Sequence, residues 1–183
     1  MLSSFQLRKL ILGYYRWDTT KDGIVRSSDF EEVGRRVANN LGVEASSGQY
    51  ESILNGYRGV WDAYWKGLDT DGDNAVTLQE VLSAAEGAFQ TTDVAASEEF
   101  AKQINMRLVS ALDADGNGEI RMKEYTAFVG ALGVNEDDAA KAFNKLDRNG
   151  SGVLLADEIA MSWAYYYASD DLTDPSNWFY GEF

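Results

Sequence analysis

One twelve-residue stretch, from Asp113 to Glu124, constrains the possible fold of this chain more than any other part of its sequence. Oxygen-bearing side chains stand at its positions 1, 3, 5 and 12, and a glycine stands at position 6. Side chains at positions 1, 3 and 5 converge on one centre only if the chain turns sharply, and glycine makes that turn because it adopts positive φ without strain. Glu124 can reach back from the first turn of the following helix and present both of its oxygens. The spacing therefore predicts a calcium-binding loop.

The same spacing returns at three other places, in residues 18–29, 69–80 and 147–158. Asn74 stands at the turn position of the second loop, where asparagine tolerates positive φ better than most other residues do. The first loop ends in Asp29, which is one methylene shorter than glutamate, so ligation by both of its oxygens requires a tighter loop. Four such loops in 183 residues indicate that the whole chain is built from repeats of this loop and its flanking segments.

Each loop is expected to hold an ion through side-chain oxygens at positions 1, 3, 5 and 12 and through the backbone carbonyl of position 7. The predicted metal ligands, loop by loop, are Asp18, Thr20, Asp22, Ile24 and Asp29; Asp69, Asp71, Asp73, Ala75 and Glu80; Asp113, Asp115, Asn117, Glu119 and Glu124; and Asp147, Asn149, Ser151, Val153 and Glu158. Position 9 is Arg26 in the first loop, Arg121 in the third and Leu155 in the fourth, none of which can ligate, so water is expected there. The third loop is expected to bind Ca²⁺ firmly, because its turn and its ligand set agree.

Apolar residues at helical spacing predict a helix on each side of every loop. The first helix runs from Ser3 to Trp17, with Ser3 and Gln6 as a capping box. One long aromatic helix is predicted over about residues 49–68, and further helices over 78–89 and 97–112. Position 8 of each loop is aliphatic, which suits a short antiparallel bridge between loops one and two and between loops three and four. These position-8 residues are Val25, Val76, Ile120 and Leu154. The predicted fold is all-α, with four helix–loop–helix hands in two pairs.

Three segments are expected in the chain. Residues 1–92 hold the N-terminal pair of hands, residues 93–169 hold the C-terminal pair, and residues 170–183 form a tail. The tail carries four aromatic side chains in six positions, and such a cluster is unfavourable in water. It can fray and promote aggregation, or it can fold back over the hydrophobic face of the helices, and we favour the second outcome.

The chain carries a formal net charge of −14, much of it in the predicted loops. Four divalent cations would bring this charge to about −6, whereas empty loops leave their carboxylates repelling one another. We therefore expect the metal-free protein to be loosened and its folding to be coupled to metal binding. Such an acidic surface disfavours nucleic acid and anionic membranes as partners.

Several residue types and sequence features that the chain lacks restrict the classes of function that are expected. The chain has no cysteine and no histidine, so neither a disulfide nor enzymatic nucleophilic or imidazole chemistry is expected. No apolar run is long enough to span a membrane, and Leu2 in place of glycine excludes a myristoyl anchor. The first residues lack the apolar run of a signal peptide. A cytoplasmic location is the expectation.

The Gly59-Val60-Trp61-Asp62 stretch before the second loop, an aromatic–glycine pair near the C-terminus and the unequal loop spacing together resemble one branch of the EF-hand superfamily. This branch is the sarcoplasmic calcium-binding proteins, with calexcitin, calerythrin and the luciferin-binding proteins as relatives. The resemblance implies two EF-hand pairs packed face to face in one compact globule that buffers Ca²⁺ and Mg²⁺. It also implies tolerance of Mg²⁺ at the first site, because Asp29 ends that loop.

Three functions are weighed. A monomeric metal buffer is favoured, because only four methionines are present, against the methionine-rich groove of a promiscuous sensor. A calcium sensor that releases its tail and captures an unidentified protein partner is the second. The third is a carrier of an apolar small molecule, in a cavity that Trp61, Trp65, Trp163 and Trp178 could line, although tryptophans at helical spacing more often form plain core. Bioluminescent oxidation is disfavoured, because the photoproteins use histidines that this chain lacks.

Overall fold

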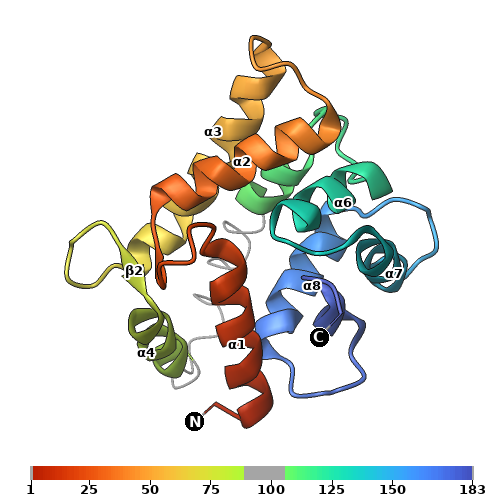
Figure 1. The fold of residues 1–183 in the computed structure, drawn as a ribbon. Helices are drawn as coiled ribbons and strands as arrows, with labels where there is room; N and C mark the ends of the chain where they lie inside the picture. Colours follow the sequence, from red (N-terminus) through yellow and green to blue (C-terminus); the bar gives the residue numbers. More distant parts are fainter. Residues whose placement is uncertain (1, 89–105, 183) are drawn as a thin grey trace.

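The structure is a computed structural model that describes residues 2–88 and 106–182. Its α-helices are α1 (Ser4–Trp17), α2 (Ser27–Leu41), α3 (Gly48–Ala63), α4 (Leu78–Ala88), α6 (Met122–Ala131), α7 (Glu136–Leu146) and α8 (Ala156–Ala168) (Figure 1). Two short 3-10 helices, η1 (Trp65–Leu68) and η2 (Pro175–Trp178), and two strands, β1 (Ile24–Val25) and β2 (Val76–Thr77), complete the named elements. Residues 106–112 are also helical. The all-α prediction is confirmed, whereas the predicted boundary at residues 92 and 93 lies outside the described residues, as does the start of the helix predicted over 97–112.

The helix ends follow local chemistry. Ser3 Oγ accepts a hydrogen bond from the Gln6 amide at 3.1 Å, and Gln6 Oε1 accepts one from the Ser3 amide at 3.0 Å, so the predicted capping box is present. α2 ends at Gly42, whose φ of 74° few other residues adopt without strain. Among the described helices, none has the length and the apolar content that a membrane span requires.

The single helix predicted over residues 49–68 is wrong in one respect, because the chain breaks at Tyr64. α3 ends one residue earlier and η1 begins one residue later, with Tyr64 at φ −127° and ψ −62° between them. The break lets neighbouring rings face different partners: Tyr64 meets Trp163 edge-on at 5.4 Å, while Trp65 meets Phe30 at 5.6 Å. Aromatic packing on both sides overrides the local preference for a continuous helix.

The paired loops are joined as the position-8 residues predict. Val25 of β1 lies opposite Val76 of β2 in an antiparallel pair, and Ile120 forms an antiparallel bridge with Leu154. All four side chains are fully buried. Each bridge therefore ties two loops together through backbone hydrogen bonds while its side chains join the core.

The two halves of the chain meet along α2 and α6, which lie side by side in Figure 1. Arg36 donates to the carbonyl of Ala131 at 3.3 Å, and Arg16 of α1 donates to the carbonyl of Leu132 at 3.2 Å. These carbonyls belong to the C-terminal end of α6, where they lack partners within the helix and where the helix dipole favours cations. Two arginines from the N-terminal half thus cap a helix of the C-terminal half.

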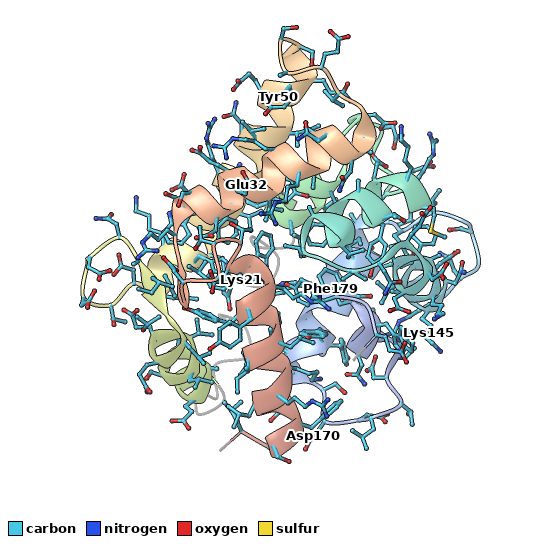
Figure 2. The ribbon with its side chains drawn as sticks, in the orientation of Figure 1. Lys21, Glu32, Tyr50, Lys145, Asp170 and Phe179 are labelled. Atoms are coloured by element: carbon cyan, nitrogen blue, oxygen red, sulfur yellow. The ribbon has the colours of Figure 1, made fainter. Side chains whose placement is uncertain are left out.

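The core that results is aromatic and continuous across both halves. Trp17 stacks on Phe30 with ring centroids 4.4 Å apart, and it also lies 6.0 Å from Phe128 of α6. The tail joins the same cluster, because Phe179 and Tyr180 are 0% and 1% exposed. Figure 2 shows Phe179 near the centre of the molecule, and its ring lies 6.4 Å from Phe128 of α6 and 6.4 Å from Tyr166 of α8. Phe179 and Tyr180 of the tail are therefore part of the core.

Polar contacts hold the tail in this place. Lys9 of α1 is 0% exposed, and its ammonium donates to the carbonyl of Ser169 at 2.7 Å and to Asn177 Oδ1 at 3.1 Å. Near the chain end, Gly181 has a φ of 91°, and a Cβ there would approach Val134 Cγ1 to 2.7 Å. The tail thus ends in a close contact that only glycine permits.

Candidate metal centres

All four loops share two positions of positive φ, although only one of them was predicted. Position 6 takes φ values between 64° and 83°, which the turn argument anticipates, in Gly23, Asn74, Gly118 and Gly152. Position 4 takes φ values between 60° and 78°, in Lys21, Gly72, Gly116 and Gly150. Sequence reasoning missed position 4, although glycine recurs there in three of the four loops. Each loop therefore needs two left-handed residues to fold its side chains inward.

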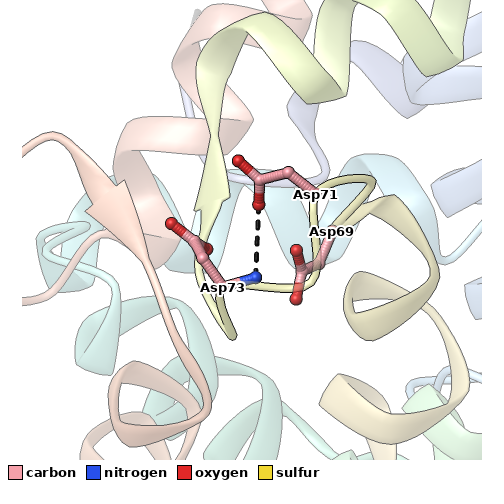
Figure 3. Close-up of side chains that lie close together, drawn as sticks. All are labelled: Asp69, Asp71 and Asp73. Carbon is pink, nitrogen blue, oxygen red and sulfur yellow. Dashed lines mark hydrogen bonds between the residues drawn. The ribbon is translucent and has the colours of Figure 1, made fainter.

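The second loop gathers three carboxylates. Oxygens of Asp69, Asp71 and Asp73 all lie within 4.8 Å of one another (Figure 3). The Asp71 carboxylate accepts a hydrogen bond from the Asp73 amide at 3.2 Å, and Asp73 accepts one from the Ala75 amide at 2.9 Å. Oxygens that share one Ca²⁺ at about 2.3–2.6 Å lie within about 5 Å of one another, so this group fits that ion.

Glu80, at position 12 of the second loop, reaches back across it. Its carboxylate accepts hydrogen bonds from the backbone and the hydroxyl of Thr77 and from the backbone and the hydroxyl of Thr70, all at 2.8–3.0 Å. The backbone bond from Thr77 is the largest influence on its pKa, and with the Thr70 bonds it outweighs burial and lowers the pKa of Glu80 to about 2. The carboxylate is therefore held ionised and aimed at the loop.

The third loop gathers Asp113, Asp115 and Glu124, whose oxygens also lie within 4.8 Å of one another. Glu124 is only 6% exposed and accepts hydrogen bonds from the Ala114 amide at 2.9 Å and the Arg121 amide at 3.0 Å. The remaining predicted ligands lie on the same loop, with Asn117 Oδ1 accepting the Glu119 amide at 2.8 Å. A buried position-12 carboxylate and a closed turn agree with the expectation of firm binding.

The first loop is the most buried of the four at its ends. Asp18 and Asp29 are each 1% exposed. Asp29 Oδ1 accepts from the Thr19 amide at 3.0 Å and from the Thr19 hydroxyl at 2.7 Å, and its Oδ2 accepts from the Arg26 amide at 2.9 Å. The shorter aspartate side chain therefore does close this loop. Thr20 Oγ1 lies 3.3 Å from Asp18 Oδ1, so positions 1 and 3 are also adjacent.

Asp22 at position 5 of the first loop has a different environment. Its Oδ1 accepts from the Ile24 amide at 2.9 Å, and its Oδ2 lies 2.8 Å from Arg26 Nη1. The side chain is engaged by a cation of its own loop. Among the described residues, the groups of three carboxylates close enough to share an ion lie in the second and third loops.

The fourth loop relies on neutral oxygens. Asp147 accepts from the Ser151 amide at 3.0 Å and the Gly152 amide at 2.8 Å, and Asn149 Oδ1 accepts from the Ser151 amide at 2.7 Å. The Ser151 hydroxyl donates to the carbonyl of Val153 at 2.9 Å, so the position-5 and position-7 oxygens are in contact. Position 12, Glu158, accepts from the Leu155 amide at 3.1 Å. The fourth loop therefore has the predicted turn, and it presents fewer carboxylates at its ligand positions than the other three loops do.

The family model described as "EF hand" matches residues 139–160, which cover the fourth loop. Calerythrin of Saccharopolyspora erythraea is 26% identical over 144 residues, which are 79% of this chain and 81% of that protein. The luciferin-binding protein of Renilla reniformis is 26% identical over 183 residues, covering 98% of this chain and 95% of that one. Calcium-dependent protein kinase 33 of Arabidopsis thaliana matches at 32% identity, but over only 20% of its length.

Solved structures share the whole fold. The calcium-loaded apo form of the coelenterazine-binding protein from Renilla muelleri superposes with a TM-score of 0.85 at 23% identity, over all of both chains. A Streptomyces coelicolor calcium-binding protein gives 0.72 at 27% identity, over 88% of this chain and 97% of that one. The sarcoplasmic calcium-binding protein from amphioxus gives 0.70 at 21% identity, over all of both chains.

Fold, loops and relatives together define a calcium-binding EF-hand protein. The similarity to calerythrin and to the Streptomyces coelicolor protein, together with the EF-hand match at the fourth loop, confirms the resemblance found in the sequence. Occupancy of each individual loop stays a prediction, as does the absence of enzymatic activity.

Proposed function

We propose that this protein is a cytoplasmic Ca²⁺/Mg²⁺ buffer that acts as a monomer. The observation that carries the proposal is the burial of Phe179 and Tyr180 in the core that both halves share. A sensor that captures a partner helix offers an apolar groove for it, whereas this tail occupies the space between Trp17 and Tyr166. A buffer needs only loops that take up ions with little opening of the helices.

Magnesium is part of the proposal for the first loop. Asp29 closes that loop as an aspartate, which suits a smaller cage, and Mg²⁺ accepts few protein carboxylates because it keeps several waters. A ctenophore photoprotein of similar fold, berovin, has a TM-score of 0.62 and 15% identity, and all three of its Ca²⁺-binding loops bind magnesium ions. Mg²⁺ binding to this chain is proposed by analogy with that behaviour.

Isothermal titration with Ca²⁺, with and without millimolar Mg²⁺, tests the buffer. We expect several Ca²⁺ sites, with at least one whose apparent affinity falls when Mg²⁺ is present. Anilinonaphthalene sulfonate provides a second readout, because a buffer binds this dye best without metal, when its core is loosened. Dye fluorescence that increases on adding Ca²⁺ would instead indicate a sensor and would contradict the proposal.

Carriage of an apolar ligand is the second candidate, and one internal cavity favours it. Two of the four tryptophans considered for such a cavity, Trp65 and Trp163, line it, whereas Trp61 and Trp178 do not. The rest of its lining is Trp17, Val60, Tyr64, Leu108, Tyr167 and Tyr180. The Tyr180 hydroxyl lies 3.1 Å from the Tyr167 hydroxyl and accepts a hydrogen bond from Trp17 Nε1 at 3.2 Å. Polar groups converging in an aromatic cavity are a feature of ligand sites.

The cavity in its present form has a free volume of about 10 Å³, which is room for roughly one water molecule. Ligand pockets occupy about 300–1,000 Å³, so carriage requires Tyr180 and the tail to move. Titration with coelenterazine, the ligand named for the Renilla muelleri relative, tests this candidate through tryptophan fluorescence. Saturable quenching that a Tyr180→Ala substitution alters would support carriage, and its absence would leave the buffer as the sole proposal.

A further inference from the structure

Arg26 and Arg121 occupy the same position of two different loops, yet their guanidinium groups have different partners. Both stand at position 9, Arg26 in the first loop and Arg121 in the third. Arg26 Nη1 lies 2.8 Å from Asp22 Oδ2, whereas Arg121 Nη2 lies 3.1 Å from Glu119 Oε2. Both ion pairs are partly exposed, so the two loops form a matched comparison.

The two partners have different roles in metal binding. Asp22 stands at position 5, where the side-chain oxygen is the ligand. Glu119 stands at position 7, where the backbone carbonyl is the ligand and the side chain is not needed. Arg26 therefore engages a carboxylate that an incoming ion uses as a ligand, whereas Arg121 engages one whose side chain the ion does not use.

Other charges hold Arg26 at this place. The hydrogen bond to Asp22 is the first cause that raises the pKa of Arg26, and the charges of Asp29 and of Asp73 in the paired second loop add to it. Predicted ligands of two loops therefore contribute to the negative electrostatic potential at the Arg26 guanidinium. The rest of the first loop is closed by the Asp29 contacts to Thr19, and a cation on Asp22 offsets one of the loop's three carboxylate charges without a metal.

We propose that Arg26 is a built-in competitor for the first metal site. It occupies the position-5 carboxylate in the metal-free protein, keeps the loop folded, and has to leave Asp22 before a divalent cation can use that oxygen. The first site then binds more weakly than its three carboxylates alone would allow, and it fills after the third. This inference rests on the first loop being a metal site, as the proposed buffer requires.

The test compares Arg26→Gln with Arg121→Gln, which remove the same charge from equivalent positions. Site-resolved reporters exist in both loops, because the Gly23 amide donates to Asp18 Oδ2 and the Gly118 amide donates to Asp113 Oδ2, each at 2.9 Å. A Ca²⁺ titration followed by nuclear magnetic resonance reads each site through its own glycine amide. Hydrogen exchange of the same amides without metal measures how well each loop stays closed.

Arg26→Gln is expected to tighten Ca²⁺ binding at Gly23 by up to about fivefold, the worth of an exposed ion pair, and to speed Gly23 amide exchange in the metal-free protein. Arg121→Gln is expected to change both readouts at Gly118 much less. Equal effects in the two variants would reduce Arg26 to a background charge and overturn the inference. If Gly118 titrates while Gly23 titrates in neither the parent nor Arg26→Gln, the inference fails but a buffer with fewer sites stands. If neither glycine titrates and calorimetry detects no Ca²⁺ binding at the other loops either, the buffer itself fails.

Discussion

The guanidinium of Arg148 lies 3.0 Å from the carboxylate of Asp174 and 2.8 Å from the hydroxyl of Ser176. Arg148 stands at position 2 of the fourth loop, and its two partners stand in the tail. Burial opposes ionisation of Asp174, but hydrogen bonds from Ser176 and the charge of Arg148 outweigh it and lower the pKa of this carboxyl. The fourth loop is thereby connected directly to the segment that fills the core.

Arg148→Ala is expected to loosen the tail and to cost about 1 kcal/mol, because the arginine is partly exposed and its ion pair is screened by water. Hydrogen–deuterium exchange over residues 174–182 should increase. Arg35→Ala is the control, since its exposed ion pairs with Glu31 and Glu32 lie within α2 and do not involve the tail. Unchanged exchange in the tail of Arg148→Ala would show that the contact does not hold it.

Lys9→Met is expected to destabilise the protein by about 2 kcal/mol, because it leaves the partly buried Ser169 carbonyl and the buried Asn177 amide oxygen without their donor. Urea unfolding of the calcium-loaded protein measures the loss. Lys141→Met provides the matched exposed control, with an expected change close to zero. A Lys9 variant as stable as its parent would mean that apolar packing alone holds α1 to the tail.

Lys21→Gly is expected to stabilise the protein by less than about 1 kcal/mol. Lys21 adopts a φ of 60° at the position where three other loops have glycine, and a left-handed conformation costs a residue with a Cβ about 1–2 kcal/mol. Part of the gain is offset by the larger conformational freedom of glycine in the unfolded chain. Thermal unfolding of this variant should show a higher midpoint, whereas Gly116→Lys, the reverse change in the third loop, should lower it.

Glu124→Gln is expected to abolish or severely weaken the third site, because position 12 supplies two charged oxygens to the ion. Glu119→Gln removes the same charge from the same loop, but at a position that binds through its backbone carbonyl, so it should change the affinity little. Calorimetric Ca²⁺ titration of both variants gives the comparison. Near-native affinity at the third site of Glu124→Gln would refute the ligand assignment.

Stability is expected to fall as the pH rises above about 10, because burial raises the pKa of tyrosines in the core. The pKa of Tyr64 rises to about 12, and burial raises the pKa of Tyr57 and Tyr167 further above the ordinary value of 10.0. In the unfolded chain these phenols lose their protons near 10.0, so the unfolded state binds fewer protons and gains relative stability at alkaline pH. Ultraviolet absorbance of phenolate should increase cooperatively with unfolding; gradual ionisation of all tyrosines in a folded protein would contradict this.

The loops and most helices could be predicted because their signals are local. Ligand spacing, the Ser3 capping box and the aliphatic position-8 residues each act over a few positions, and the structure contains the capping box and both position-8 bridges. The break at Tyr64 could not be predicted, because it depends on rings such as Trp163 that lie far along the chain. The second left-handed position had a visible signal, because glycine recurs at position 4 of three loops.

The contacts that hold the tail could not be predicted either, because they also join residues that lie far apart in the sequence. Lys9 and Asn177 are separated by 168 positions, and a single lysine in a helix gives no sign that it will be buried. The carboxylate pairs with Arg26 and Arg148 were equally hidden, since an arginine in an acidic loop has several possible partners. Tertiary packing determines which carboxylate each arginine contacts, and that packing is not visible in the local sequence.

The burial of Lys9 limits how proteins of this architecture can be recombined. If this N-terminal helix were grafted onto the EF-hands of a relative, the Lys9 ammonium would enter a core whose tail is not built to accept its hydrogen bonds. If a relative's tail were grafted onto this chain, Lys9 would lack the Ser169 and Asn177 acceptors. The first helix and the last segment should therefore diverge as a unit during evolution, and chimeras should fold only when both are taken from the same parent.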